Sequence, residues 1–158
     1  MTNFSRSRTR KFLYQYLYAK TFNLVENESF RDSFFNWIFS SEIDETYLSE
    51  MQKNIAEKEV FYIYVIEKFF PKFNVVDMDL AFLLPSIIAL SEIFSYFEEL
   101  PIKVIINESV EISKSYWTDS SRKMVNWLLD SVNKNIASLE QEYKEFDFTK
   151  PYKSIFVK

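Results

Sequence analysis

Apolar residues recur along the chain at intervals of three and four, and the strict alternation typical of β-strands is nearly absent. In the first apolar segment, over residues 8–22, Phe12 and Tyr16 stand four positions apart, which puts them on one side of a helix. The same spacing predicts further helices over residues 29–39, 45–56, 60–70, 79–96 and 102–116. The chain is therefore predicted to be all-α.

A stripe of apolar residues predicts one more helix near the C-terminus, beginning at candidate caps around Asp119 and ending at Phe146. Its members follow one another at steps of three or four: Met124, Leu128, Val132, Ile136, Leu139, Tyr143 and Phe146. Residues 147–158 have no helical period and are predicted to form a tail. With 158 residues, about the size of one domain, the sequence predicts a single domain of about seven helices over residues 1–146.

Proline and polar residues mark the expected helix boundaries. The polar stretch 56–59 is interpreted as a break between two helices, and Pro71 is expected to end the second of them. Pro101 suits the first turn of the helix that follows it. The segment 79–96 is the most hydrophobic, which is typical of a buried central helix, and Pro85 is expected either to stand in its first turn or to kink it.

The chain contains no glycine, no cysteine and no histidine. Without glycine it lacks the phosphate-binding loops of nucleotide-binding enzymes; without cysteine or histidine it lacks thiol nucleophiles, Ser-His-Asp triads and the usual zinc sites. Its 23 acidic residues leave hydrolysis by paired carboxylates and binding of Mg²⁺ or Ca²⁺ formally open. No apolar run approaches the roughly 20 residues of a membrane span, and the N-terminal sequence does not resemble a signal peptide. We therefore expect a soluble, cytoplasmic domain with no metal and no cofactor.

Charge is distributed unevenly along the chain. Residues 1–20 hold five of the 19 basic residues and none of the 23 acidic residues, so this segment carries +5 and the remainder −9. Four of these cations are close together in the sequence: Arg6, Arg8, Arg10 and Lys11. A basic segment on an acidic body is typical of a protein that binds a polyanion.

Several stretches resemble the motifs of one known family. Residues 101–114, PIKVIINESVEISK, resemble the stretch PxKVxINEAVELAK, and residues 123–130, KMVNWLLD, resemble KFVNGVLD. Residues 5–10, SRSRTR, and 15–18, QYLY, are similar to an Arg-rich opening followed by QALY. Residues 87–92, IIALSE, are a looser counterpart of a helix that ends AxYE. On these motifs the chain resembles the NusB family of bacterial transcription antitermination factors.

The resemblance implies an all-α fold of two packed three-helix subdomains and no catalytic activity. It also implies binding of the single-stranded boxA element in leader transcripts of ribosomal RNA, together with NusE, a ribosomal protein of the small subunit. Such a factor would work in the antitermination complex of RNA polymerase. Some members of the family are homodimers, so either a monomer or a homodimer is open for this chain.

The basic first helix and the start of the last predicted helix form the candidate RNA-binding site. Arginine and lysine neutralise phosphates, and a glutamine beside a tyrosine suits an amide that reads a base edge next to a ring that stacks. The candidate residues are Arg6, Arg8, Arg10, Lys11, Gln15, Tyr18, Arg122 and Lys123. On a helix, Arg6 and Arg10 share one side. Arg8 and Lys11 share nearly the opposite side, so all four cations face one strand only if this segment is extended.

Each candidate also has a structural explanation. The arginines suit a solvated N-terminus, and Tyr18 suits packing in the core beside Tyr14. Arg122 and the lysine after it suit a surface pair with Asp119. Glu108 is interpreted as structural, because a carboxylate near the start of a helix interacts favourably with the helix dipole.

The chain departs from the family pattern at four positions. Trp127 stands where the family has glycine, and Met124 stands where it has phenylalanine. Around Phe82 and Ile87 the family commonly has charged residues. These departures favour an alternative, a helical protein-interaction module of the same fold that has lost RNA recognition. A second alternative is an accessory domain beside an RNA-modifying enzyme, because NusB-like domains also occur fused to ribosomal RNA methyltransferases.

Overall fold

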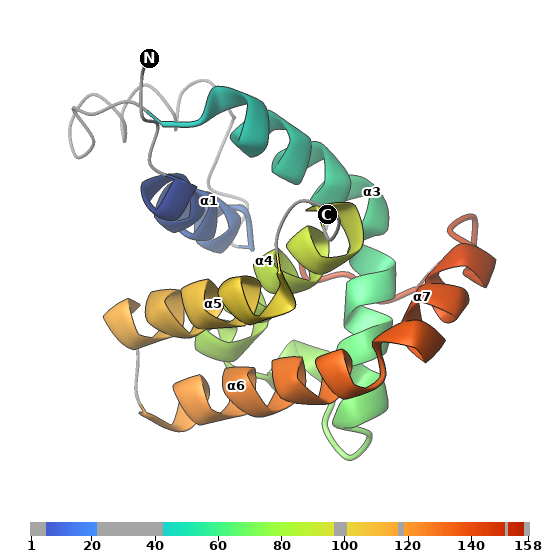
Figure 1. Ribbon diagram of the computed structural model, residues 1–158. Helices are drawn as coiled ribbons and strands as arrows, with labels where there is room; N and C mark the ends of the chain where they lie inside the picture. The colour runs from blue at the N-terminus through green and yellow to red at the C-terminus, as the bar shows by residue number, and fades with distance from the viewer. Residues whose placement is uncertain (1–5, 22–42, 97–100, 117–118, 151, 157–158) are drawn as a thin grey trace.

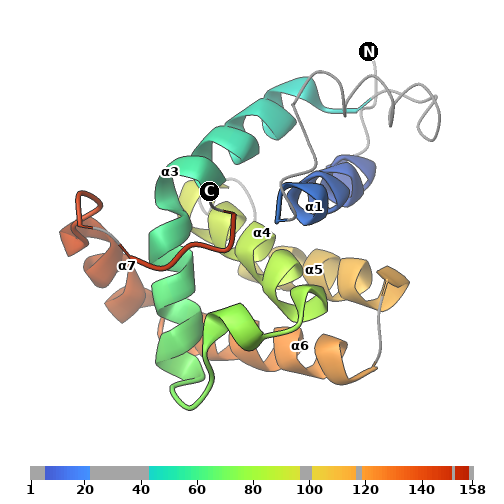
Figure 2. The same ribbon diagram turned by 180° about the vertical axis from the view of Figure 1, so that it is seen from behind.

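The computed structural model describes residues 6–21, 43–96, 101–116, 119–150 and 152–156 (Figures 1 and 2). Within these ranges the chain forms six α-helices, one short 3₁₀ helix and no strand, so the predicted all-α class is confirmed. In chain order they are α1 (Arg6–Thr21), α3 (Glu45–Phe69), η1 (Val75–Asp77), α4 (Leu80–Tyr96), α5 (Ile102–Tyr116), α6 (Asp119–Lys134) and α7 (Ile136–Glu145). No helix among the described residues combines the length and the hydrophobicity that a transmembrane segment needs. The helix predicted over residues 29–39 lies outside the described residues.

The central helix of the fold is α4, which packs against α1, α3, α5 and α6 (Figure 1). Every residue from 81 to 93 is buried, so the prediction of a buried central helix is confirmed. The Asp79 side chain caps the first turn by accepting a hydrogen bond from the Ala81 amide at 3.0 Å. Pro85 stands inside the helix, in its second turn. Through its buried sides, α4 forms the base on which α1 lies.

The predicted break at residues 56–59 is wrong, because the two helices expected on either side of it form one continuous helix, α3. Glutamate and lysine are good helix formers, so a polar stretch without proline or glycine does not end a helix. Asp44 caps the first turn by accepting a hydrogen bond from the Tyr47 amide at 3.0 Å. The helix ends at Phe69, just before Pro71, as predicted.

The single helix predicted from Asp119 to Phe146 is also wrong, because it is divided into α6 and α7 at Asn135. Asn135 leaves the helical conformation, with φ −116° and ψ 19°, and its side-chain amide donates to the Ser131 carbonyl at 2.8 Å. Asparagine competes in this way for backbone groups and therefore favours helix ends. The apolar stripe continues across the break, so periodicity alone does not reveal it.

Aromatic side chains join α7 to α3 and α4. The buried Phe61 ring lies at the centre of this cluster, and the ring centroids of Phe94, Tyr143 and Phe146 lie 5.1, 5.0 and 5.2 Å from its own. All three contacts are edge-to-face, the arrangement that aromatic rings prefer. This cluster extends the core beyond α4 to the C-terminal part of the chain.

The tail returns along α3, as Figure 2 shows, and two carboxylates of that helix hold it. Lys153 pairs with Glu67, with Nζ 2.6 Å from Oε2. The Ser154 hydroxyl donates to Glu59 at 2.5 Å, and the next backbone amide donates to the same carboxylate at 3.0 Å. The described residues of the tail contain no helix, in agreement with the sequence prediction.

Candidate nucleic-acid interface

One side of α1 presents a row of polar and basic side chains to the solvent. Steps of three, four and three residues place the four members in line along the helix. They are Arg8, Lys11, Gln15 and Tyr18, which we call the α1 strip. Arg8 and Tyr18 are exposed, and the other two are partly exposed. The remaining sides of α1 are occupied by buried residues, among them Phe12.

The residue at which α1 begins decides which of the four basic residues share one side of the helix. The helix already begins at Arg6, so the basic segment is helical and not extended. Arg8 and Lys11 therefore share the solvent side, as predicted for a helix, while Arg10 points toward the interior. The four cations do not face one strand together.

Arg10, one of the candidate RNA contacts, is buried, and only 4% of its side chain is exposed. Its guanidinium makes three hydrogen bonds to the Glu92 carboxylate of α4, at 3.1, 3.1 and 2.7 Å. Glu108 of α5 lies 3.4 Å from the same guanidinium, in line with the structural interpretation of that residue. Burial lowers the pKa of Arg10, but the hydrogen bond and charge of Glu92, together with the charges of Tyr47 and Glu108, raise it overall. This charged group therefore anchors α1 to α4 and α5.

Arg6 lies at the edge of the α1 strip, beside α3. Its guanidinium carbon is 5.0 Å from the centroid of the Tyr47 ring, and that of Arg10 is 5.7 Å from the same centroid. Arg6 also approaches Asp44, with Nη2 3.7 Å from Oδ2. Burial, with the nearby charge of Glu92, raises the pKa of Tyr47 well above its ordinary value, so the ring stays neutral. One third of the Arg6 side chain is exposed, which leaves it at the border between core and surface.

Two further candidate cations stand at the start of α6. Arg122 pairs with Asp119, with Nη2 3.1 Å from Oδ1, so the surface pair considered from the sequence is present. Lys123 is exposed. In Figures 1 and 2 the N-terminal ends of α1 and α6 lie on the same side of the molecule, with α5 between them.

The four departures from the family pattern differ in their surroundings. Phe82 and Ile87 are completely buried in α4, so packing explains their apolar character. Met124 is partly buried against the core. Trp127 is 51% exposed, which makes it the departure that changes the surface most.

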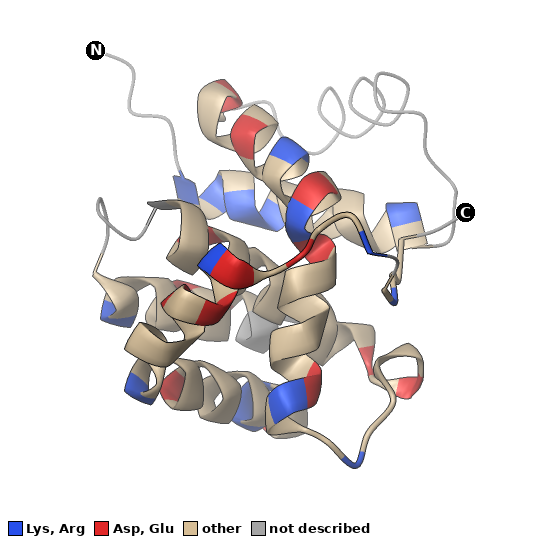
Figure 3. Cartoon of the chain, turned by 90° about the vertical axis from the view of Figure 1, so that its right-hand side faces the viewer, with Lys and Arg blue, Asp and Glu red and all other residues tan. Residues whose placement is uncertain are grey.

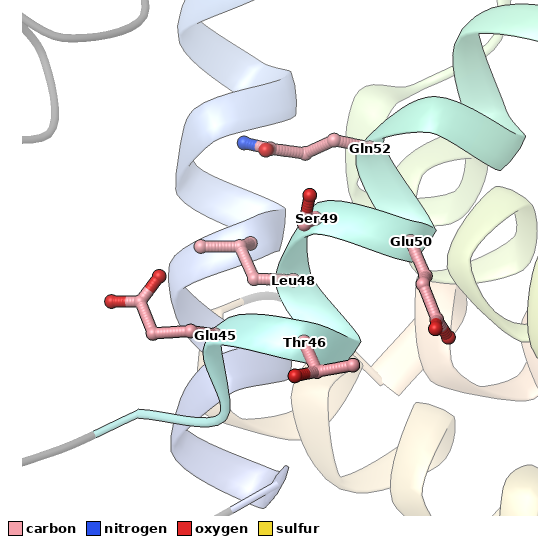
Figure 4. Close-up of a pocket in the computed structure, with 6 residues that line it drawn as sticks. All are labelled: Glu45, Thr46, Leu48, Ser49, Glu50 and Gln52. Carbon is pink, nitrogen blue, oxygen red and sulfur yellow. The ribbon is translucent and has the colours of Figure 1, made fainter.

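Acidic residues lie beside the basic helix α1, on the first turns of α3 (Figure 3). Figure 3 shows Lys and Arg along α1 and Asp and Glu on the first turns of α3 beside it. A pocket of about 530 Å³ lies on those turns (Figure 4). It is lined by Glu45, Thr46, Leu48, Ser49, Glu50 and Gln52. Two carboxylates in its lining disfavour a phosphate there, and no group of three or more acidic side chains in the described residues could hold a metal ion.

Comparison with known proteins identifies the family. A model of the NusB family matches residues 7–134, which run from α1 to the end of α6. The chain belongs to the NusB family. Its relatives include the transcription antitermination protein NusB of Pseudothermotoga lettingae, 46% identical over 48 residues, or 30% of this chain and 34% of that protein. The protein of the same name from Natranaerobius thermophilus is 32% identical over 88 residues, or 56% of this chain and 60% of that protein. No solved structure matches the chain.

The match to the NusB family also has limits along the chain. It ends at the last residue of α6, so α7 and the tail lie outside it. The chain spans about a third of the length of the first of these relatives. Within the matched range, sequence reasoning missed the role of Glu92 as the partner of Arg10. The available signal was its position at the end of the family-like motif over residues 87–92.

Proposed function

We propose that this chain is a transcription antitermination factor that binds single-stranded, boxA-like leader RNA of ribosomal RNA transcripts. Its membership of the NusB family supports this, as do relatives named transcription antitermination protein NusB. The observation that carries the RNA-binding part is the α1 strip, a basic and aromatic row on an otherwise acidic chain. The factor acts in the cytoplasm by assembling a complex on nascent RNA and performs no bond chemistry.

In this proposal each member of the α1 strip has one task. Arg8 and Lys11 neutralise phosphates of the strand, which gives binding its salt dependence. The amide of Gln15 hydrogen-bonds the edge of an unpaired base, and the ring of Tyr18 stacks on a neighbouring base. Single-stranded RNA suits this row because its bases are free to turn toward a protein surface.

The other basic candidates take different parts. Lys123 adds a phosphate contact from the start of α6, and Arg122 adds a weaker one because Asp119 already engages it. Arg6 supports the edge of the row from its position over Tyr47. Arg10 contacts no RNA and holds α1 in place through Glu92 and its own burial.

The proposed protein partner is NusE, in the antitermination complex of RNA polymerase. Outside the first 20 residues the chain carries −9, so its surface is suited to a basic ribosomal protein. The same charge disfavours RNA on the acidic parts of that surface and favours the basic side of α1. The chain binds these partners as a monomer or a homodimer.

A salt titration tests the RNA contact. Binding of a fluorescent AU-rich single strand is measured by anisotropy at several salt concentrations, for the whole chain and for Arg8→Ala. Loss of one phosphate contact should weaken binding and flatten the slope of log K against log salt by about 0.7. Lys144→Ala is the matched control, because Lys144 is an exposed lysine of α7 on the opposite side of Figure 1 from the start of α1.

Two outcomes would contradict the proposal. If Arg8→Ala and Lys144→Ala have the same affinity and slope, the α1 strip is not the RNA site. If the unmodified chain recovers protein partners and no enriched RNA from a lysate, the alternative of an interaction module without RNA recognition is correct.

A further inference from the structure

An exposed group of aromatic rings lies where the C-terminal end of α3 meets the middle of α6. Trp127 of α6 is 51% exposed and Phe73, in the turn after α3, is 58% exposed. The ring centroid of Phe70 lies 5.1 Å from that of Trp127 and 6.2 Å from that of Phe73. Phe69 lies 6.4 Å from Trp127. We call these four rings the Trp127 platform.

The inner side of the Trp127 platform packs on the core, and its outer side is exposed to solvent. Phe70 packs edge-on against the completely buried Phe82 at 5.2 Å, so the ring next to Trp127 is fixed to the core. The contacts of Trp127 with Phe69 and Phe70 have interplanar angles of 83° and 62°. Neither is a parallel stack, and half of the indole side chain remains accessible.

Cations flank the platform. Lys123 is exposed one helical turn before Trp127 on the same side of α6. Lys72 is exposed in the turn that carries Phe73. Asp130, the acidic residue about one turn after Trp127, is paired with Lys134 at 3.0 Å, which compensates its charge. Exposed rings between cations are the combination that binds single-stranded nucleic acid, because bases stack on the rings and the cations follow the phosphates.

We propose that the Trp127 platform stacks a base of the same single-stranded RNA that the α1 strip binds. The proposal rests on the proposed function and adds a second contact region, reached through Lys123. The family pattern has glycine at this position, so the contact is a property of this chain. Stacking accepts any base, because every base has a flat π face. The platform therefore adds affinity and strand length without adding base preference.

Affinity and salt slope together test this contact. The same anisotropy titration is made with Trp127→Ala, Trp127→Phe and Arg8→Ala. Trp127→Ala should weaken binding about tenfold, the loss expected when one base loses its aromatic partner, and should leave the salt slope unchanged. Trp127→Phe should keep most of the affinity. Tyr152→Ala, which removes a ring of similar exposure from the tail, is the matched control and should have no effect.

A second measurement locates the contact without a substitution. RNA that carries a photoreactive uridine is crosslinked to the unmodified chain, and the crosslinked peptides are identified by mass spectrometry. Crosslinks are expected in the peptide with Trp127 and in the peptide of α1. Circular dichroism melting of every variant verifies that the fold is intact.

The outcomes separate this inference from the proposed function. If Arg8→Ala weakens binding while Trp127→Ala does not, and the crosslinks lie in α1 alone, the α1 strip stands and the platform contact is refuted. If the unmodified chain binds no RNA, both are refuted. If Trp127→Ala changes the sedimentation of the chain from dimer to monomer and leaves RNA affinity unchanged, the platform is a self-association surface and the inference is wrong.

Discussion

Arg10→Met should destabilise the fold strongly. Methionine, like arginine, has a long unbranched side chain, but it carries no charge. Glu92 then remains as an unpaired carboxylate at 0% side-chain exposure. The second carboxylate, Glu108, is 34% exposed and can be hydrated when its partner is lost. The cost therefore comes mainly from Glu92.

The expected magnitude follows from this burial. Removal of one partner from a buried ion pair costs about 3–5 kcal/mol. For a chain of this size, that loss lowers the melting temperature by about 6–20 °C. The pair of Arg6 with Asp44 is the natural comparison, because its atoms are 3.7 Å apart and partly exposed. Such a pair contributes about 0–1 kcal/mol, so Arg6→Met should change the melting temperature by only a few degrees.

Thermal and urea unfolding, followed by circular dichroism, measure these differences. The series contains the unmodified chain, Arg6→Met, Arg10→Met and the double variant Arg10→Met with Glu92→Leu. The double variant should recover most of the lost stability, because apolar residues often replace a buried ion pair without loss. Equal losses for Arg6→Met and Arg10→Met would refute the reasoning. So would a double variant that is no more stable than Arg10→Met alone.

Two further predictions concern the C-terminal part of the chain. Glu59→Gln should loosen the tail, because the glutamine amide has one acceptor oxygen in place of two and turns its NH2 group toward one of the two donors, the Ser154 hydroxyl or the Ile155 amide. Trypsin should then cut faster after Lys153. Glu57→Gln, at an exposed position of α3, is the control, and equal cutting rates for the two variants would contradict the prediction. The hydrogen bond from Lys68 lowers the pKa of the Glu142 carboxyl from its ordinary value of 4.5, so the unfolded chain binds this proton more tightly than the folded chain. The stability that this hydrogen bond contributes is complete above about pH 4.5 and is lost as the pH falls through the lowered pKa of Glu142. Lys68→Met removes the hydrogen bond, so the melting temperature should decline less steeply over this acidic range. An unchanged decline would disprove the link between the pKa of Glu142 and stability.

Periodicity predicted the class of the fold because helices must bury one side. The segment 102–116 coincides with α5, and the apolar segment 79–96 coincides with buried α4 to within one residue. Pro71 ended the preceding helix because proline restricts the residue before it. These are local effects, so the sequence contains what is needed to predict them.

The errors arose where tertiary packing or a single residue decides. The charged stretch 56–59 remains helical because its neighbours on both sides pack into the same core, a fact that a local pattern does not contain. At Asn135 one residue leaves the helical conformation while the apolar stripe continues. Helix propensity agrees with the continuation of α3, and a local side-chain hydrogen bond of Asn135 accompanies the end of α6. Apolar periodicity alone predicts neither feature.

The candidate site also has one feature that spacing predicts and one that it does not. Spacing predicted that Arg8 and Lys11 share one side of a helix, and the structure confirms this. Spacing does not predict which side faces solvent, because that depends on where α1 lies on α4. The sequence therefore does not predict that Arg10 is buried, because its partner Glu92 stands 82 positions later in the chain.

Burial of Arg10 also explains how a short row of side chains keeps a defined position. The apolar side of α1, which includes Phe12, already has to face the core, because rotation of the helix would expose it. The hydrogen bonds of Arg10 to Glu92 are directional, so they define the rotation of α1 more closely. With that rotation fixed, Arg8 lies nearly opposite Arg10 on the helix and Lys11 lies about a quarter turn from Arg10, so both reach the solvent. The buried Arg10 therefore helps to orient α1 so that Arg8 and Lys11 remain at the surface.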